Sequence, residues 1–173
     1  MTGHPGSAAP PSPWIVRHLG LVPAGGHVLD LAAGSGRHAR LAAERGYRVT
    51  ALDRDVSDLR KIPAIETIEH DLEASGPLPF GTARFDGIIV TNYLWRPLLA
   101  TLPDMVADGG ALLYETFARG NERFGKPSNP DFLLIPGELL DCVRGRLKVV
   151  AYEDGETDIP RPAVVQRIAA IRR

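Results

Sequence analysis

The chain has 173 residues, of which 44% are hydrophobic and 24% are charged, and its formal net charge is −1. This composition is typical of a globular protein, and a chain of this length can bury one sizeable core without disulfide or metal staples. The balanced charge gives no general attraction to nucleic acid or to anionic lipid, which disfavours both as partners.

Cys142 is the only cysteine, so the chain has no internal disulfide and a reducing compartment is expected. No segment reaches the roughly 20 apolar residues that a membrane helix needs, and the first residues lack the pattern of a secretory signal. We therefore expect a cytoplasmic protein without a membrane partner. The five histidines show no metal-ligand spacing, and no metal is predicted.

Glycine and proline crowd the start of the chain, so we expect residues 1–13 to form a disordered tail and residues 14–173 to form a single domain. Strands are predicted at residues 27–31, 47–52, 65–70, 85–90, 111–117, 147–152 and 164–171. Helices are predicted at residues 13–20, 37–45, 55–61, 94–107 and 137–144, and an irregular loop at residues 118–136. This alternation predicts an α/β fold with a doubly wound, mostly parallel sheet.

The first strand leads into a glycine turn, and acids follow the first three strands. Gly34 and Gly36 allow a tight turn that a ligand can approach closely. Asp53 ends the second strand, where a carboxylate can accept hydrogen bonds from both hydroxyls of a ribose, and Asp71 follows the third. The alternative is that the glycines serve strand–helix packing and that the acids cap the helices that follow.

Charge decides which nucleotide this pocket favours. A dinucleotide carries a pyrophosphate and its turn normally has three glycines, whereas here Ala32 takes the first glycine position and Asp30 adds a negative charge. S-adenosylmethionine carries an ammonium, a sulfonium and no phosphate. The acids therefore favour S-adenosylmethionine as the cofactor.

Five segments in order resemble the motifs of class I S-adenosylmethionine-dependent methyltransferases. They read DLAAGSGRHARLA, ALDRD, HDLE, FDGIIVTNYL and ADGGALLYETF. The resemblance implies a Rossmann-like sheet of seven strands with the last strand antiparallel. The chain departs from the family where Ala32 and Ala33 replace a common Gly-Cys pair, and we expect no sizeable N-terminal or inserted substrate domain.

The resemblance also implies cofactor roles for particular residues. It assigns the methionine part to Asp30 and the turn, the ribose to Asp53 and the adenine to Asp71 and Leu72. The cofactor residues predicted in this way are Asp30, Ala32, Gly34, Ser35, Gly36, Asp53, Arg54, Asp71, Leu72, Thr91 and Asn92.

The sequence leaves the catalytic residue and the methyl acceptor open. Methyl transfer depends chiefly on positioning, so a general base is optional, and Tyr93, Glu115 and His18 are the candidates. Aromatic and polar side chains after the fourth and fifth strands predict a substrate face that Trp14 and His18 close. The substrate-binding candidates are Trp14, Tyr93, Trp95, Arg96, Phe117 and Asn129.

The sequence thus predicts an S-adenosylmethionine-dependent methyltransferase that acts on a small-molecule acceptor. The segment Thr91-Asn92-Tyr93-Leu94 lacks the Asn-Pro-Pro-aromatic motif associated with methylation of adenine or glutamine amino groups. The alternatives are an NAD(P)-dependent oxidoreductase and a non-catalytic cofactor-binding member of the fold.

Overall fold

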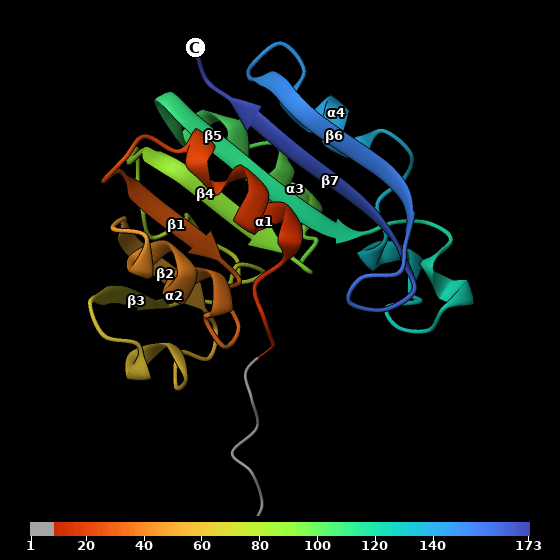
Figure 1. The fold of residues 1–173 in the computed structure, drawn as a ribbon, viewed down its shortest axis with the longest axis horizontal. Coiled ribbons are helices and arrows are strands. Elements are labelled where there is room, and N and C mark those ends of the chain that lie inside the picture. Colours follow the sequence, from red (N-terminus) through yellow and green to blue (C-terminus); the bar gives the residue numbers. More distant parts are fainter. Residues whose placement is uncertain (1–8) are drawn as a thin grey trace, which may run out of the picture.

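Seven strands form one mixed sheet in the computed structural model, which describes residues 9–173 (Figure 1). The strand order is β3-β2-β1-β4-β5-β7-β6. The strands are β1 (His27–Leu31), β2 (Arg48–Asp53), β3 (Ile65–Glu69), β4 (Phe85–Thr91), β5 (Val106–Phe117), β6 (Lys148–Thr157) and β7 (Ala163–Ile171). Strands β1 to β5 pair in parallel, and β7 runs antiparallel to both β5 and β6. The predicted fold class is confirmed.

Short helices cover both faces of this sheet (Figure 1). The α-helices are α1 (Pro13–His18), α2 (Arg37–Glu44), α3 (Arg96–Leu99) and α4 (Glu138–Val143). The 3₁₀ turns are η1 (Leu19–Leu21), η2 (Leu59–Lys61), η3 (Leu102–Met105), η4 (Asn121–Arg123) and η5 (Pro130–Phe132). Apolar side chains of α1 and α2 belong to one buried cluster, and those of α3 and α4 belong to another. The sheet therefore separates two cores, as a doubly wound fold requires.

The helix predicted at residues 94–107 is wrong. Only α3 and η3 form there, and β5 begins at Val106. Pro97 and Pro103 are the second residues of α3 and η3, and they occur there because proline lacks the N–H that a helix interior needs. Strand β5 then continues through Gly110, where a Cβ would lie 2.7 Å from the carbonyl oxygen of Asp86 on β4.

Two other elements differ in length from the prediction. Only η2 forms within the helix expected at residues 55–61, and β6 extends to Thr157 rather than ending at Tyr152. The extension pairs with β7 as far as Ala163. The turn-rich composition of residues 153–162 hid this part of the strand.

The predicted tail, residues 1–13, lies for the most part outside the described residues. Of its described end, Ser12 is 5% exposed and its Oγ accepts a 3.2 Å hydrogen bond from the backbone N–H of Trp14. This is the N-cap of α1, and Pro13 occupies the first helical position. The ordered contacts of the chain therefore begin before Trp14.

No helix within residues 9–173 is long and apolar enough to cross a membrane.

Strand β7 lies between β5 and β6, so we expect its buried side chains to contribute strongly to stability. Ile168 is 0% exposed, and Ile168→Ala should lower the free energy of unfolding by about 2–5 kcal/mol through lost burial and a new cavity. Val150, which is 47% exposed on β6, provides the control, and Val150→Ala should change it by less than about 0.5 kcal/mol. Urea denaturation measures both, and equal effects would contradict this placement of β7.

Candidate functional site

The turn between β1 and α2 uses a left-handed backbone at three positions. Ala32, Gly34 and Gly36 have φ values of 51°, 57° and 83°. The φ of Gly36 favours glycine where α2 begins, and a Cβ there would also displace the side-chain ends of Ile62 and Leu59. A Cβ on Gly34 would meet nothing within 4 Å, so a ligand can approach the backbone there.

Asp53, the last residue of β2, holds this turn in place. Its Oδ2 accepts a 2.8 Å hydrogen bond from the N–H of Gly34, and its Oδ1 accepts a 3.1 Å bond from the N–H of Asp55. The carbonyl oxygen of Leu52 accepts a 3.0 Å bond from the N–H of Ala33. A carboxylate has about four acceptor positions, so Asp53 can still accept hydrogen bonds from ligand hydroxyls.

A cavity of about 300 Å³ opens beside Asp53, and we call it the acidic cavity because Asp53, Asp71 and Glu73 line it. Its other lining residues are Ala32, Leu52, Arg54, His70, Leu72, Asn92 and Tyr93. Part of the predicted cofactor set lines this cavity, namely Ala32, Asp53, Arg54, Asp71, Leu72 and Asn92. The structure thus brings together the residues that follow β1, β2, β3 and β4, as expected for the carboxyl ends of neighbouring parallel strands.

The remaining predicted cofactor residues are not on the wall of the acidic cavity. Gly34 and Ser35 are exposed on the turn, and Gly36 is buried beneath it. Thr91 Oγ1 lies 3.3 Å from Nδ1 of His38, so its hydroxyl is engaged within the protein. Asp30 is 1% exposed on β1.

Asp30 is a buried acid with no hydrogen bond of ordinary geometry to either carboxylate oxygen among the described residues. Burial raises the pKa of its carboxyl to about 7, although the nearby Ala39 N–H and the Arg37 guanidinium act in the opposite direction. Such an acid sits one residue before the end of β1, next to the turn. A cationic ligand at the turn would favour its charged form.

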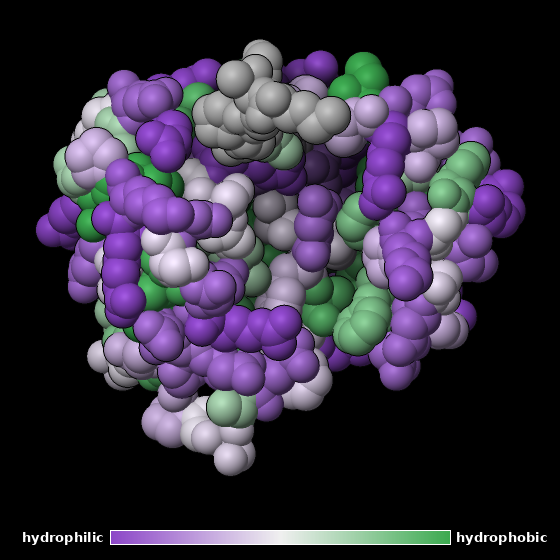
Figure 2. Space-filling model, turned by 90° about the horizontal axis from the view of Figure 1, so that it is seen from below, coloured by the Kyte–Doolittle hydropathy of each residue, from purple (hydrophilic) through white to green (hydrophobic). Residues whose placement is uncertain are grey.

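A second cavity, of about 290 Å³, shares Asn92 with the acidic cavity. One wall is formed by residues 9–13, which we call the strap, and we call this space the strap cavity. Its other lining residues are Arg37, Asn92, Glu115, Phe117, Thr157, Ile159, Pro160, Arg161, Ala163, Val165 and Arg167. Figure 2 shows the hollowed face of the molecule. Asn92, with a left-handed φ of 54°, stands where the two cavities meet.

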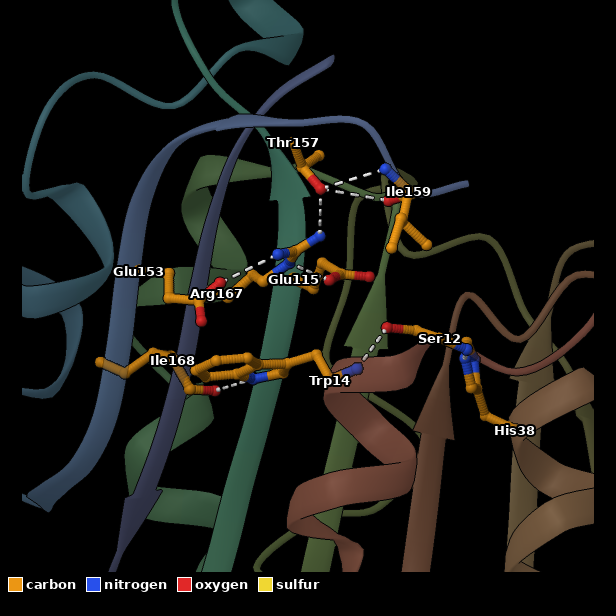
Figure 3. A network of polar contacts seen from close by, with 9 residues as sticks. All are labelled: Ser12, Trp14, His38, Glu115, Glu153, Thr157, Ile159, Arg167 and Ile168. Carbon is orange, nitrogen blue, oxygen red and sulfur yellow. Dashed lines mark hydrogen bonds and ion pairs between the residues drawn. The ribbon is translucent and has the colours of Figure 1, made fainter. Parts of the chain in front are cut away.

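Helix α2 anchors the strap. The N–H of Ser12 donates a 3.0 Å hydrogen bond to Nε2 of His38 (Figure 3), and Arg37 donates a 2.9 Å bond to the carbonyl oxygen of Pro10. Burial, assisted by the charge of Arg37, lowers the pKa of His38 to about 3, so its ring is neutral. Because Nε2 accepts, the ring proton lies on Nδ1 and is donated to Thr91 Oγ1. His38 thus connects the strap, α2 and the end of β4.

A buried ion pair lies on the floor of the strap cavity. The Nε of Arg167, on β7, donates to Oε2 of Glu115 at the end of β5, and its NH1 donates a 2.9 Å bond to Glu153 on β6. A third nitrogen lies 3.4 Å from Thr157 Oγ1, and Figure 3 shows these contacts together. Glu115, a predicted catalytic candidate, therefore faces the cavity with one oxygen engaged by Arg167.

The structure places Trp14 and His18 away from the predicted substrate face, because neither lines the acidic cavity or the strap cavity. Their rings stack at 4.2 Å between centroids, and Trp14 Nε1 donates a 3.3 Å hydrogen bond to the carbonyl oxygen of Ile168 on β7 (Figure 3). Both side chains are buried where α1 packs on the sheet. Helical spacing identified the buried face of α1 but could not show which part of the sheet that face covers.

Three further substrate candidates have structural roles. Arg96 binds Glu138 at 2.8 Å and the carbonyl oxygens of residues 131 and 133 at 2.9 Å each, which ties the loop to α4. The Oδ1 of Asn129 caps η5 by accepting a 3.0 Å bond from the N–H of Asp131. Trp95 packs against the apolar cluster beside α3. The sequence showed these polar and aromatic groups but not their partners within the fold.

Tyr93 and Phe117 remain at the site. Tyr93 lines the acidic cavity and donates a 3.3 Å hydrogen bond to Glu73, and Phe117 lines the strap cavity. Burial and the nearby Glu73 carboxylate raise the pKa of the Tyr93 hydroxyl, so it stays protonated. Tyr93 is therefore placed as a hydrogen-bond donor rather than as a base.

Most of the strap cavity was not predicted from the sequence. The strap was expected to belong to a disordered tail, and no helix or strand was predicted between residues 152 and 164, whereas both segments supply walls of the cavity. The only sequence signal was compositional, since prolines occur in both segments and Arg161 lies in the second.

Comparisons with known proteins show what this chain is similar to in sequence and in fold. A family model described as a methyltransferase domain matches residues 29–105, and no curated protein matches the chain. Among solved structures, TehB from Haemophilus influenzae aligns with a TM-score of 0.74 and 19% identity over 92% of this chain and 61% of TehB. This chain thus spans less than two thirds of TehB.

Two more solved structures are similar. A TehB-like SAM-dependent methyltransferase from Corynebacterium glutamicum aligns with a TM-score of 0.65 and 17% identity over 92% of this chain and 88% of that one. The 1,6-didemethyltoxoflavin-N1-methyltransferase of Burkholderia thailandensis, solved with its substrate and S-adenosylhomocysteine, aligns with a TM-score of 0.67 and 17% identity over 92% and 76%. The family match and the shared fold confirm the resemblance to class I S-adenosylmethionine-dependent methyltransferases.

The buried acid Asp30 gives a pH prediction. Its pKa is raised in the folded state, so its contribution to stability is complete below about pH 4 and is lost as the pH rises through about 7. The variant Asp30→Asn has no charge to bury and should gain stability relative to the wild type between pH 5 and 8. Urea denaturation across this range measures the difference in the free energy of unfolding between the variant and the wild type. Groups that titrate equally in both proteins do not contribute to this difference.

The exposed Asp108, whose side chain is 85% exposed, supplies the control through Asp108→Asn. The free energy of unfolding of this variant should change with pH in the same way as that of the wild type. The same pH dependence for Asp30→Asn as well would contradict the assignment of a raised pKa to Asp30.

Proposed function

We propose that the chain transfers a methyl group from S-adenosylmethionine to a small molecule bound in the strap cavity. The observation that carries this proposal is the meeting of the acidic cavity and the strap cavity at Asn92. A transferase needs adjoining sites for donor and acceptor, and these two cavities share one residue at the carboxyl end of β4.

The acidic cavity suits the adenosine part of this cofactor. Asp53 keeps free acceptor positions at a strand end, where it can bind both ribose hydroxyls, and Asp71 and Leu72 lie along the same wall for the adenine. Asp71, Glu73 and the buried Asp30 make this region favourable for a cationic sulfonium and ammonium. The same acids would repel the pyrophosphate of NAD.

Bound S-adenosylmethionine supplies an activated methyl group on a sulfonium. The protein then has to hold the acceptor in line with that group and to exclude water, and such positioning can contribute on the order of 7–11 kcal/mol. The exposed amide of Asn92 stands at the junction for this purpose, and the strap covers the acceptor side. Neither Tyr93, which donates to Glu73, nor Glu115, which is bound by Arg167, is arranged as a free base.

The ribose assignment predicts a loss of affinity in Asp53→Ala. Removing a charged acceptor of two hydroxyls should weaken binding of S-adenosylhomocysteine by about 1.5–3 kcal/mol, as measured by calorimetry. Asp53→Asn, which keeps one acceptor oxygen, should fall between the wild type and Asp53→Ala. Asp108→Ala, at the amino end of β5, should bind as the wild type does.

Parallel titrations with S-adenosylmethionine, S-adenosylhomocysteine and NAD separate the candidate classes. The proposal expects binding of the first two and not of NAD. Binding of NAD alone would identify an oxidoreductase, and cofactor binding without methyl transfer to any acceptor would identify a non-catalytic member of the fold. Wild-type affinity in Asp53→Ala would refute the ribose assignment.

A further inference from the structure

The strap cavity combines apolar walls with unbalanced positive charge. Prolines of the strap, Phe117, Ile159 and Val165 supply apolar surface. Its charged lining residues among residues 9–173 are Arg37, Arg161, Arg167 and Glu115. Three guanidinium groups thus face a space that contains one carboxylate.

Arg167 is already neutralised, whereas the other two arginines are not. Arg167 binds both Glu115 and Glu153. Arg37 donates to the carbonyl oxygen of Pro10 at 2.9 Å, and Arg161 donates to that of Lys126 at 3.1 Å. Neither forms an ion pair with a carboxylate of the described residues, and a guanidinium with one such bond keeps most of its five N–H groups free.

Arg161 also lies against the apolar wall. Its guanidinium carbon is 5.9 Å from the centre of the Phe117 ring, and both residues line the cavity. A guanidinium held over an aromatic ring presents its N–H groups at the edge, where they can bind a planar anion with two parallel hydrogen bonds. A ligand with an apolar body and one carboxylate would complement both the wall and the charge.

We propose that the methyl acceptor is a compact, largely apolar molecule with one carboxylate, which Arg161 binds directly and to which Arg37 adds favourable charge. This inference rests on the proposed function, since it concerns the acceptor half of the same site. The volume of about 290 Å³ limits the acceptor to a small molecule, close to the lower end of typical ligand pockets. Arg161 is exposed, so a carboxylate would replace water on guanidinium N–H groups that no described residue binds, through charge-assisted hydrogen bonds.

Matched probes test this preference by binding rather than by turnover. Full-length protein is first titrated with S-adenosylhomocysteine, and the saturated complex is then titrated with 4-hydroxybenzoate and its amide, 4-hydroxybenzamide. Indole-3-acetate and indole-3-acetamide form a second pair of different shape. We expect the carboxylate of at least one pair to bind about tenfold more tightly than its amide, and the difference to shrink as salt is added.

Arginine variants test whether residues of the strap cavity cause this preference for the carboxylate. Arg161→Gln should remove the preference for the carboxylate, and Arg37→Gln should reduce it. Arg40→Gln is the matched control, because Arg40 is an exposed arginine on the same helix as Arg37 and lines neither cavity. All three variants should bind S-adenosylhomocysteine as the wild type does. Arg161→Gln and Arg40→Gln should also keep the wild-type melting temperature, whereas Arg37→Gln loses the bond to Pro10 that anchors the strap.

Three outcomes would contradict the proposed carboxylate site, and a fourth would contradict the proposed function. If S-adenosylhomocysteine binds but neither carboxylate binds better than its amide, including the case in which no probe binds, the acceptor is not held by a carboxylate. Retention of the preference in Arg161→Gln would exclude Arg161 as its source. A loss of S-adenosylhomocysteine binding in Arg37→Gln would assign Arg37 to the cofactor. Failure of the wild type to bind S-adenosylhomocysteine would instead refute the proposed function.

Discussion

The hydrogen bond from the Gly34 N–H to the Asp53 carboxylate is the contact on which the site depends. Together with the bond from the Ala33 N–H to the carbonyl oxygen of Leu52, it fastens two consecutive residues of the turn to the end of β2. The parallel pairing of β1 with β2 sets this geometry, since Leu31 is in register with Leu52. A slip of one residue would turn the Asp53 side chain to the other face of the sheet and release the turn.

Helix α2 connects the glycine turn at the acidic cavity with the strap at the strap cavity. It begins at the glycine turn, and its first two residues, Arg37 and His38, hold the strap through Pro10 and Ser12. His38 also donates to Thr91, which precedes Asn92 at the junction of the cavities. The strap and the glycine turn are therefore fixed to the same short helix. Under the proposed function, one helix thus supports both the cofactor turn and a wall of the acceptor cavity.

The sequence predicted the strands and part of the acidic cavity, because both follow local rules. Continuous apolar runs identified the central strands, and the ends of parallel strands must meet at one edge of the sheet, so Asp53, Asp71 and Asn92 lie near one another. The helix at residues 94–107 was wrong because its apolar spacing concealed the effects of Pro97 and Pro103.

The strap cavity could not be predicted in the same way, because its walls come from both ends of the chain. The strap and β7 are about 150 residues apart and meet through tertiary contacts such as that of Trp14 with the carbonyl oxygen of Ile168, at a separation of 154. The prediction that polar loop side chains bind substrate failed for a related reason, since their partners are also distant in the sequence or lie in the backbone. Arg96 and Asn129 have the chemistry of binding residues, but the loop uses them to satisfy its own backbone.

A crystal structure of the protein with S-adenosylhomocysteine is the most direct test of the central claim. We expect the ribose hydroxyls to bind Asp53, the adenine to lie beside Asp71 and Leu72, and the sulfur to lie at Asn92 and face the strap cavity. A nucleoside bound outside the acidic cavity, or a sulfur directed away from the strap cavity, would contradict it.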